Sequence, residues 1–212
     1  MLPSPQPSIA ETVEAPENPL CSEKLADANP AQSDHLLMER ICLGEETALD
    51  QLLVRHWSSL VRYAAGFVQG VDAAEDIVQE AFIRLWEIRE KWMPGGSPRR
   101  FLYTVVRNLC LNERERRSVR IGWSSRSQQQ GRVNPTPMEM LQHDEVLRAL
   151  KAAIDRLPSR RREVFELVYL HGLPYSEVAG IMGIATPTVA NQVSAALDTI
   201  RRDLSAVTDA RF

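Results

Sequence analysis

The sequence predicts an all-α protein in which two small helical domains are joined by a flexible linker, the C-terminal one being a helix-turn-helix domain. Three observations support this prediction. Apolar residues recur at spacings of three and four along most of the 212-residue chain. No segment alternates between apolar and polar residues as a half-buried strand would. Residues 118–137 are rich in serine, glutamine and proline and have no periodicity, which is typical of a linker.

The chain begins with an acidic extension, residues 1–32, that we expect to be disordered. It is rich in proline, glutamate, alanine and serine and has no aromatic residue, so it cannot bury enough apolar surface to fold. Charge is segregated along the chain. Residues 1–50 carry ten acids against two bases, a net charge of −8, whereas residues 99–126 carry eight arginines against two acids, a net charge of +6. This asymmetry predicts one positively charged partner and one negatively charged partner.

The first predicted domain spans residues 33–117 and has four helices. A short helix ends near Gly44, and a longer one ends near Gly70. Asp72-Ala-Ala-Glu75 resembles a capping box and begins a third helix, which runs to about Trp92. After a break at residues 94–96, Ser97-Pro98 caps and begins the fourth helix, where proline removes no hydrogen bond.

The second predicted domain spans residues 138–207. One helix stops at Pro158 and another at Gly172, and two more enclose a turn at Gly183 that requires a left-handed conformation. Ala179 is small where these last two helices must cross closely. The spacing of Ala179, Gly183 and the later Val189 favours a helix-turn-helix over an ordinary helical hairpin.

The last helix presents polar side chains on its outward face. Thr186-Pro187 caps and begins the helix, and Thr188, Asn191 and Gln192 lie on the outward side. Asparagine and glutamine can pair with an adenine edge, and a threonine methyl can contact a thymine methyl. This face therefore suits the major groove of DNA.

One face of the third helix is acidic and also carries apolar side chains. Its members are Asp76, Gln79, Glu80, Ile83, Trp86 and Glu87. An acidic face with an exposed tryptophan and isoleucine is suited to docking a basic partner around apolar anchors. The alternative is that Trp86 belongs to the core.

The fourth helix carries an arginine-rich stripe opposite its apolar side. Its members are Arg100, Tyr103, Arg107, Arg114 and Arg117. Arginine forks bind phosphates, and an aromatic ring between them can stack on an unpaired base. Trp92 precedes the flexible loop at residues 94–96 and is a candidate to line a pocket there. Solvated surface arginines are the alternative.

The order of these parts resembles the extracytoplasmic-function (ECF) group of bacterial RNA polymerase sigma factors. The resemblance rests on "DAAEDIVQEAFIRLWE", "RRFLYTVVRNLCLNERERR", a polar linker and "LPSRRREVFELVYLHGLPYSEVAGIMGIATPTV", and it covers about residues 36–205. It implies a factor that directs core polymerase to promoters and opens the −10 element. The implied partners are core RNA polymerase and promoter DNA, as duplex at the −35 element and as non-template single strand at the −10 element. An anti-sigma factor is a further candidate that the sequence leaves open.

The resemblance assigns roles to residues of this chain. The residues that it implies for polymerase binding are Asp76, Gln79, Glu80, Ile83 and Trp86. Those that it implies for binding the −10 element are Trp92, Arg100, Tyr103, Arg107, Arg114 and Arg117. Those that it implies for binding the −35 element are Arg160, Arg161, Arg162, Thr186, Thr188, Asn191 and Gln192. Many members carry Lys or Arg after the valine of the recognition helix, where this chain has Ala190, Asn191 and Gln192. Residues 163–200 contain no Lys or Arg. We therefore expect basic residues on either side of this segment to bind the DNA phosphates, and polymerase to supply most of the affinity for DNA.

Two other classes of protein are alternatives. A free-standing dimeric helix-turn-helix regulator would not explain the arginine-rich stripe beside an acidic face. An enzyme is not expected, since no phosphate-binding glycine loop or metalloprotease motif occurs, and neither a cofactor nor a metal is expected. No membrane insertion is expected, and three widely spaced cysteines favour a reducing cytoplasm.

Overall fold

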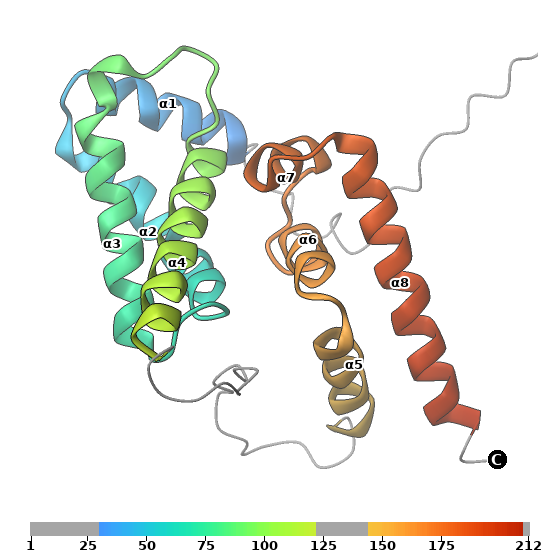
Figure 1. Cartoon of the computed structure of the whole chain (residues 1–212). Coiled ribbons are helices and arrows are strands. Elements are labelled where there is room, and N and C mark those ends of the chain that lie inside the picture. Colours follow the sequence, from blue (N-terminus) through green and yellow to red (C-terminus); the bar gives the residue numbers. More distant parts are fainter. Residues whose placement is uncertain (1–29, 122–143, 210–212) are drawn as a thin grey trace, which may run out of the picture.

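The computed structural model describes residues 30–121 and 144–209, and the regular elements of these ranges are helical (Figure 1). Their bounds are α1 Pro30–Cys42, α2 Glu46–Ala64, α3 Val71–Glu87, the short 3-10 helix η2 Arg89–Lys91, α4 Pro98–Ile121, α5 Asp144–Arg156, α6 Ser159–Tyr169, α7 Tyr175–Met182 and α8 Thr186–Asp209. The prediction of an all-α fold is confirmed for the described ranges. No helix within them is both long and apolar enough to span a membrane.

The N-terminal domain is a helical bundle. Helices α2, α3 and α4 run side by side, and α1 lies across one end of them (Figure 1). Its core forms because each helix presents an apolar stripe at helical spacing to the others. Side chains that are fully buried there include Leu52, Leu60, Val78, Leu85, Leu102 and Val106.

The helix ends of this domain differ in part from the sequence-based prediction. The residue before α3 is Gly70, at a φ of 91°, and no side chain caps the helix. The predicted capping box at Asp72–Glu75 is therefore wrong, because Asp72 already lies inside the first turn. The predicted start of α4 is confirmed, since Ser97 Oγ accepts a hydrogen bond from the main-chain N–H of Arg100 at 3.1 Å.

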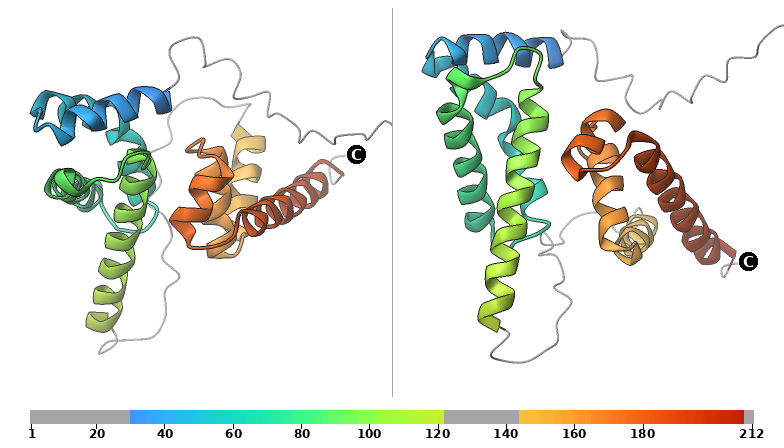
Figure 2. Two further views of the ribbon diagram at one scale, coloured as in Figure 1. Left: turned by 90° about the horizontal axis from the view of Figure 1, so that it is seen from above. Right: turned by 45° about the horizontal axis from the view of Figure 1, so that its top comes forward.

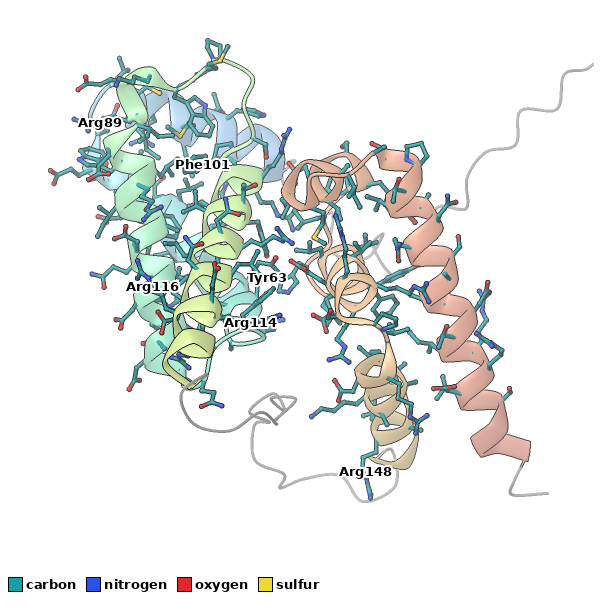
Figure 3. The ribbon with its side chains drawn as sticks, in the orientation of Figure 1. Tyr63, Arg89, Phe101, Arg114, Arg116 and Arg148 are labelled. Carbon is teal, nitrogen blue, oxygen red and sulfur yellow. The ribbon has the colours of Figure 1, made fainter. Side chains whose placement is uncertain are left out.

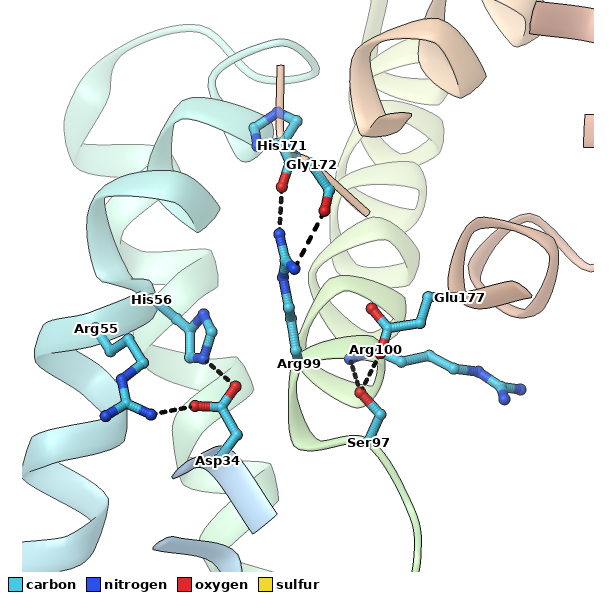
Figure 4. Close-up of polar contacts among 9 residues, drawn as sticks. All are labelled: Asp34, Arg55, His56, Ser97, Arg99, Arg100, His171, Gly172 and Glu177. Atoms are coloured by element: carbon cyan, nitrogen blue, oxygen red, sulfur yellow. Dashed lines mark hydrogen bonds and ion pairs between the residues drawn. The ribbon is translucent and has the colours of Figure 1, made fainter. Parts of the chain in front are cut away.

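A buried polar cluster attaches α1 to α2. Asp34 and His56 are only 3% and 8% exposed. The Asp34 carboxylate accepts hydrogen bonds from Arg55 Nη1 at 2.6 Å and from His56 Nε2 at 2.7 Å (Figure 4). Burial alone would raise the pKa of Asp34, but the contacts with His56 and Arg55 outweigh it and hold that pKa below its usual value.

The C-terminal domain consists of α5 to α8. The long α8 packs against α5, α6 and α7, and the buried cluster between α5, α6 and α8 comprises Ala153, Leu157, Phe165, Ala196 and Ile200. Gly183 ends α7 at a φ of 62° in the left-handed region, as the sequence predicts. The helix-turn-helix α7–α8 therefore depends on a glycine that other residues replace only with strain.

The two domains pack against each other through α4 and α7 (Figure 2). One cluster of buried apolar side chains extends from the N-terminal bundle into α6, α7 and the start of α8. Helix α4 continues to Ile121, so the first residues of the predicted linker are helical, and α1 includes the last residues of the predicted extension. The rest of both predicted segments, residues 1–29 and 122–137, lies outside the described ranges, as do residues 138–143 of the predicted second domain.

Candidate nucleic-acid interface and partner-binding face

The acidic face of α3 forms one wall of a groove of about 510 Å³ between α3 and α4. Asp76 and Glu80 line it from α3, and Arg116 and Arg117 line it from α4. Glu80 accepts a hydrogen bond from Arg84 at 2.8 Å, one turn further along α3. Both walls carry mixed charge, since Arg84 also lines the groove from α3 and Glu113 from α4, and Ala73, Ile77 and Leu109 add apolar surface.

Two apolar side chains lie on the same face of α3. Ile83 is 47% exposed, and Trp86 is half-buried against the core. The guanidinium of Arg89 lies 4.2 Å from the centre of the Trp86 ring, close enough for a cation–π contact. The sequence predicts an exposed Trp86, whereas the structure leaves only part of the ring accessible, because its other side packs on the bundle.

The arginine-rich stripe of α4 is divided between two sides of the helix. Arg100, Tyr103 and Arg107 face the C-terminal domain. Arg117 donates a hydrogen bond to Glu113 at 2.9 Å and lines the groove beside α3. Arg114 is exposed on α4 (Figure 3). The structure thus brings three of the five members together and separates the other two from them.

Tyr103 is buried, which corrects the prediction that it is exposed with the arginines. Its side chain is 1% exposed, its hydroxyl lies 3.1 Å from Nδ1 of His171, and its ring contacts the His171 ring edge-on with centroids 5.5 Å apart. Burial raises the pKa of Tyr103 to about 12. In this arrangement of the two domains, the ring cannot stack on a base.

Arg107 is held by a carboxylate from the C-terminal domain. Its Nε donates a hydrogen bond to Glu163 Oε1 at 2.7 Å, and the Tyr63 hydroxyl donates to the same oxygen at 2.8 Å. Burial would lower the pKa of Arg107, but the hydrogen bond and charge of Glu163 outweigh it and raise that pKa. For Tyr63, burial and the Glu163 carboxylate both raise the pKa. One carboxylate therefore links α6 to α2 and α4.

Three residues at the start of α4 make further contacts with the C-terminal domain, and Figure 4 shows those of Ser97 and Arg99. Arg99 donates to the main-chain carbonyls of His171 and, at 3.4 Å, Gly172. Ser97 Oγ donates to Glu177 Oε1 at 2.5 Å. The Arg100 guanidinium lies against Gly180 of α7, in the space that a Cβ atom at this position would fill. The glycine therefore leaves room for the Arg100 side chain.

Sequence reasoning missed five residues at this contact, namely Tyr63, Arg99, Glu163, His171 and Glu177. They are ordinary residue types for helix surfaces and loops, and their partners lie from 56 to 100 positions away in the chain. The sequence shows only that Glu163 directly follows a run of arginines, and this does not identify its partner.

Trp92 lies at the loop that precedes α4, as predicted. Its ring contacts the Phe101 ring edge-on with centroids 5.5 Å apart, and Gly96 lies against it at a distance that leaves little space for a side chain. The ring is half-buried. It therefore forms part of the loop surface, where its aromatic contact is with Phe101 and not with a member of the arginine-rich stripe.

The predicted reading face lies at the start of α8. Thr186, Thr188 and Asn191 are exposed there, and Gln192 Oε1 accepts a hydrogen bond from Arg161 Nε at 3.2 Å. Arg161 of α6 thus lies beside the uncharged start of α8, and the exposed Arg160 precedes it in the chain.

Arg162 differs from its two neighbours. It donates hydrogen bonds to the main-chain carbonyls of Ile154 at 3.0 Å and Leu157 at 3.1 Å. These carbonyls belong to the last turn of α5 and to the residue after it, where unpaired acceptors need donors. The prediction that Arg162 contacts phosphate is corrected accordingly: its guanidinium caps α5. Among the described residues, no cluster of His, Cys, Asp and Glu is suited to hold a metal ion.

Two protein-family models match the chain. Sigma-70 region 2 matches residues 52–120, and Sigma-70 region 4 matches residues 147–200. The ECF RNA polymerase sigma factor SigE of Mycolicibacterium smegmatis is 31% identical over 71% of this chain and 60% of its own length. The ECF RNA polymerase sigma factor SigL of Mycobacterium tuberculosis is 30% identical over 76% of this chain and 91% of its own length.

A solved structure has the same fold. The sigma factor RpoE of Bartonella quintana, crystallised with the anti-sigma factor NepR, is similar with a TM-score of 0.59 and 24% identity, over 74% of this chain and 96% of that one. At this identity the likeness establishes the fold alone.

Proposed function

Because the chain belongs to the ECF group of bacterial RNA polymerase sigma factors, we propose specific faces of it for the polymerase and for each promoter element. The observation that carries the proposal is the presence of a region 2 domain followed by a region 4 domain on one chain, each with a chemically suited face. A free-standing dimeric regulator would need only the second domain.

The polymerase face is the acidic face of α3, comprising Asp76, Gln79, Glu80, Ile83 and Trp86. Its carboxylates suit a basic partner, and the exposed part of Ile83 supplies an apolar anchor of the kind that dominates interface energies. The half-buried Trp86 contributes the edge of its ring while its core contacts hold it in one orientation.

The −10 element binds at the face of α4 that carries Arg100, Tyr103 and Arg107, with Trp92 at the preceding loop and Arg114 and Arg117 further along. Arginine pairs with phosphates as a planar fork, and aromatic rings stack on unpaired bases. Unstacking a base costs a few kcal/mol, which the contacts with these side chains offset.

The −35 element binds at the start of α8. Asn191 and Gln192 contact base edges, and Thr186 and Thr188 approach the backbone and a base methyl, while main-chain N–H groups at the helix start bind a phosphate. Arg160 and Arg161 contact the flanking phosphates. This distribution supplies the positive charge that α8 itself lacks over residues 186–200.

The location and control of the factor follow from these roles. A polymerase subunit acts in the cytoplasm, where core polymerase and the chromosome are, and it catalyses no reaction of its own. An anti-sigma factor is the partner that accompanies the structurally similar RpoE, and we propose a partner of the same kind for this chain.

Gel filtration with purified bacterial core RNA polymerase tests the proposal. The chain should co-elute with polymerase, and Asp76→Arg combined with Glu80→Arg should abolish co-elution. The matched control is Glu46→Arg with Asp50→Arg, an equally charged pair one turn apart on an exposed part of α2. A chain that elutes as a DNA-binding dimer and ignores polymerase would contradict the proposal.

A further inference from the structure

A hydrogen bond joins Arg161 of α6 to Gln192 on the reading face of α8. Arg161 Nε donates to Gln192 Oε1 at 3.2 Å, although the two residues are 31 positions apart in the chain. A guanidinium carries only N–H donors, so it can bind the amide oxygen but not the amide NH2 group. The contact therefore fixes the orientation of the Gln192 amide, with its oxygen towards Arg161 and its NH2 group left for another partner.

We infer that Arg161 is a positioning residue for base reading, which makes Gln192 a hydrogen-bond donor to the DNA and so disfavours cytosine at the base that Gln192 contacts. The inference rests on the proposed function of α8 and specifies its base preference. In the major groove, guanine presents O6 and N7 as acceptors, and thymine presents O4. Cytosine presents only its N4 amino donor, which would meet the NH2 donor of Gln192 without forming a hydrogen bond.

A glutamine without such a partner would not discriminate against cytosine in this way. The terminal torsion of glutamine is roughly two-fold, so a free amide can present either its oxygen or its NH2 group to a base. Arg161 disfavours the second orientation, because that orientation would set the NH2 group of Gln192 against the donors of the guanidinium. Both side chains are half-buried, so their hydrogen bond is partly shielded from water.

The rest of the Arg161 fork remains suited to a phosphate, since the bond to Gln192 uses Nε and the Nη groups carry the remaining donors. Its neighbours in the arginine run differ from it, because Arg160 is exposed and Arg162 caps α5. Loss of a phosphate contact weakens binding to every base alike, since such contacts carry no sequence information. Loss of the positioning contact changes the ratio of affinities between bases, so the two roles can be measured separately.

Holoenzyme binding to promoters that carry each of the four bases at each −35 position tests the inference. The holoenzyme is core RNA polymerase with the full chain, and Gln192→Ala identifies the position that Gln192 reads, because the base preference there is lost. In the unmodified chain, cytosine at that position should bind about tenfold more weakly than guanine or thymine. Arg161→Ala should lower the overall affinity and also reduce this ratio by about threefold or more.

Arg160→Ala is the matched control, since it removes an equal charge from the adjoining position. It should weaken binding to all four bases alike and leave the ratio unchanged. The double variant Arg161→Ala with Gln192→Ala should have the same ratio as Gln192→Ala alone, because the effect of Arg161 on base choice acts through Gln192. Circular dichroism establishes that each variant is folded.

An unchanged ratio in folded Arg161→Ala would overturn the inference. If Arg161→Ala is not folded, the unmodified chain decides alone, and cytosine that binds as well as guanine or thymine overturns the inference. If Gln192→Ala alters no base preference while the holoenzyme still binds its promoter, the reading role of Gln192 fails and the inference fails with it. If the unmodified chain gives core polymerase no promoter binding at all, the proposed function fails.

Discussion

Glu163 of α6 accepts a hydrogen bond from Arg107 of α4 at 2.7 Å, although the two residues are 56 positions apart in the chain. This contact joins the domain that carries the proposed −10 face to the domain that carries the proposed −35 face. The proposed function places these domains on separate promoter elements. The structure is a closed form in which the domains are packed together, and we expect promoter binding to break the contact.

Alanine substitutions of Arg162 and Arg160 should have different effects, the first on stability and the second on DNA binding, although the two residues are only two positions apart. Arg162→Ala removes charge-assisted hydrogen bonds to two carbonyls at the end of α5 and should lower the free energy of unfolding by about 1.5–3 kcal/mol. Arg160→Ala should leave stability unchanged and weaken holoenzyme binding to all promoters alike, with a salt dependence reduced by about one unit of slope. Urea unfolding and promoter binding at several salt concentrations measure the two effects. An Arg162→Ala chain of unchanged stability would contradict the capping role.

Acid stability should depend on Asp34. Because its pKa in the folded chain lies below the unfolded value, its contribution to stability is present above about pH 4 and is lost as the pH falls through the folded pKa. Asp34→Asn should therefore destabilise the protein at neutral pH, by about 1–3 kcal/mol. The difference from the unmodified chain should shrink in acid. Thermal unfolding between neutral and acidic pH measures this, and a constant difference at all pH values would rule out the carboxylate as its source.

Base reading at the −35 element should depend on α8. Asn191→Ala should cost about 1–3 kcal/mol of binding and relax the preference at one or two base positions. Gln192→Ala should act similarly and also release Arg161, with which it shares a hydrogen bond. The measurement is holoenzyme binding to a panel of single-base promoter variants. Unaltered base preferences in both variants would mean that specificity comes from DNA shape or from the −10 contacts.

Opening of the −10 element should depend on the closed face of α4. Replacing Tyr103 and Arg107 together by alanine should reduce open-complex formation more than holoenzyme assembly, since stacking is worth about 1–3 kcal/mol per base. Permanganate reactivity of the −10 thymines measures melting. The same substitutions also loosen the closed form, so the folded state is checked by circular dichroism. Normal reactivity in the double variant would count against the −10 assignment.

The sequence predicts the helices well and the contacts between domains poorly, for physical reasons. Apolar periodicity and glycine turns are local signals, so the turn at Gly183 and the start of α4 at Ser97 were predictable. The capping box was not borne out because Gly70 already supplies the turn into α3. The burial of Tyr103 was not predictable, because the sequence pattern of its helical stripe does not differ between a face exposed to solvent and a face covered by another domain. The partners that decide this, Glu163 and His171, carry no local signature.

Run-off transcription with purified core polymerase on a genomic library is the measurement that tests the central claim most directly. Core polymerase supplemented with this chain should initiate at discrete sites that are absent without it, and these transcripts should disappear with Asp76→Arg and Glu80→Arg but persist with Glu46→Arg and Asp50→Arg. The same transcripts with and without the chain would contradict the account of this protein as a promoter-directing subunit of RNA polymerase.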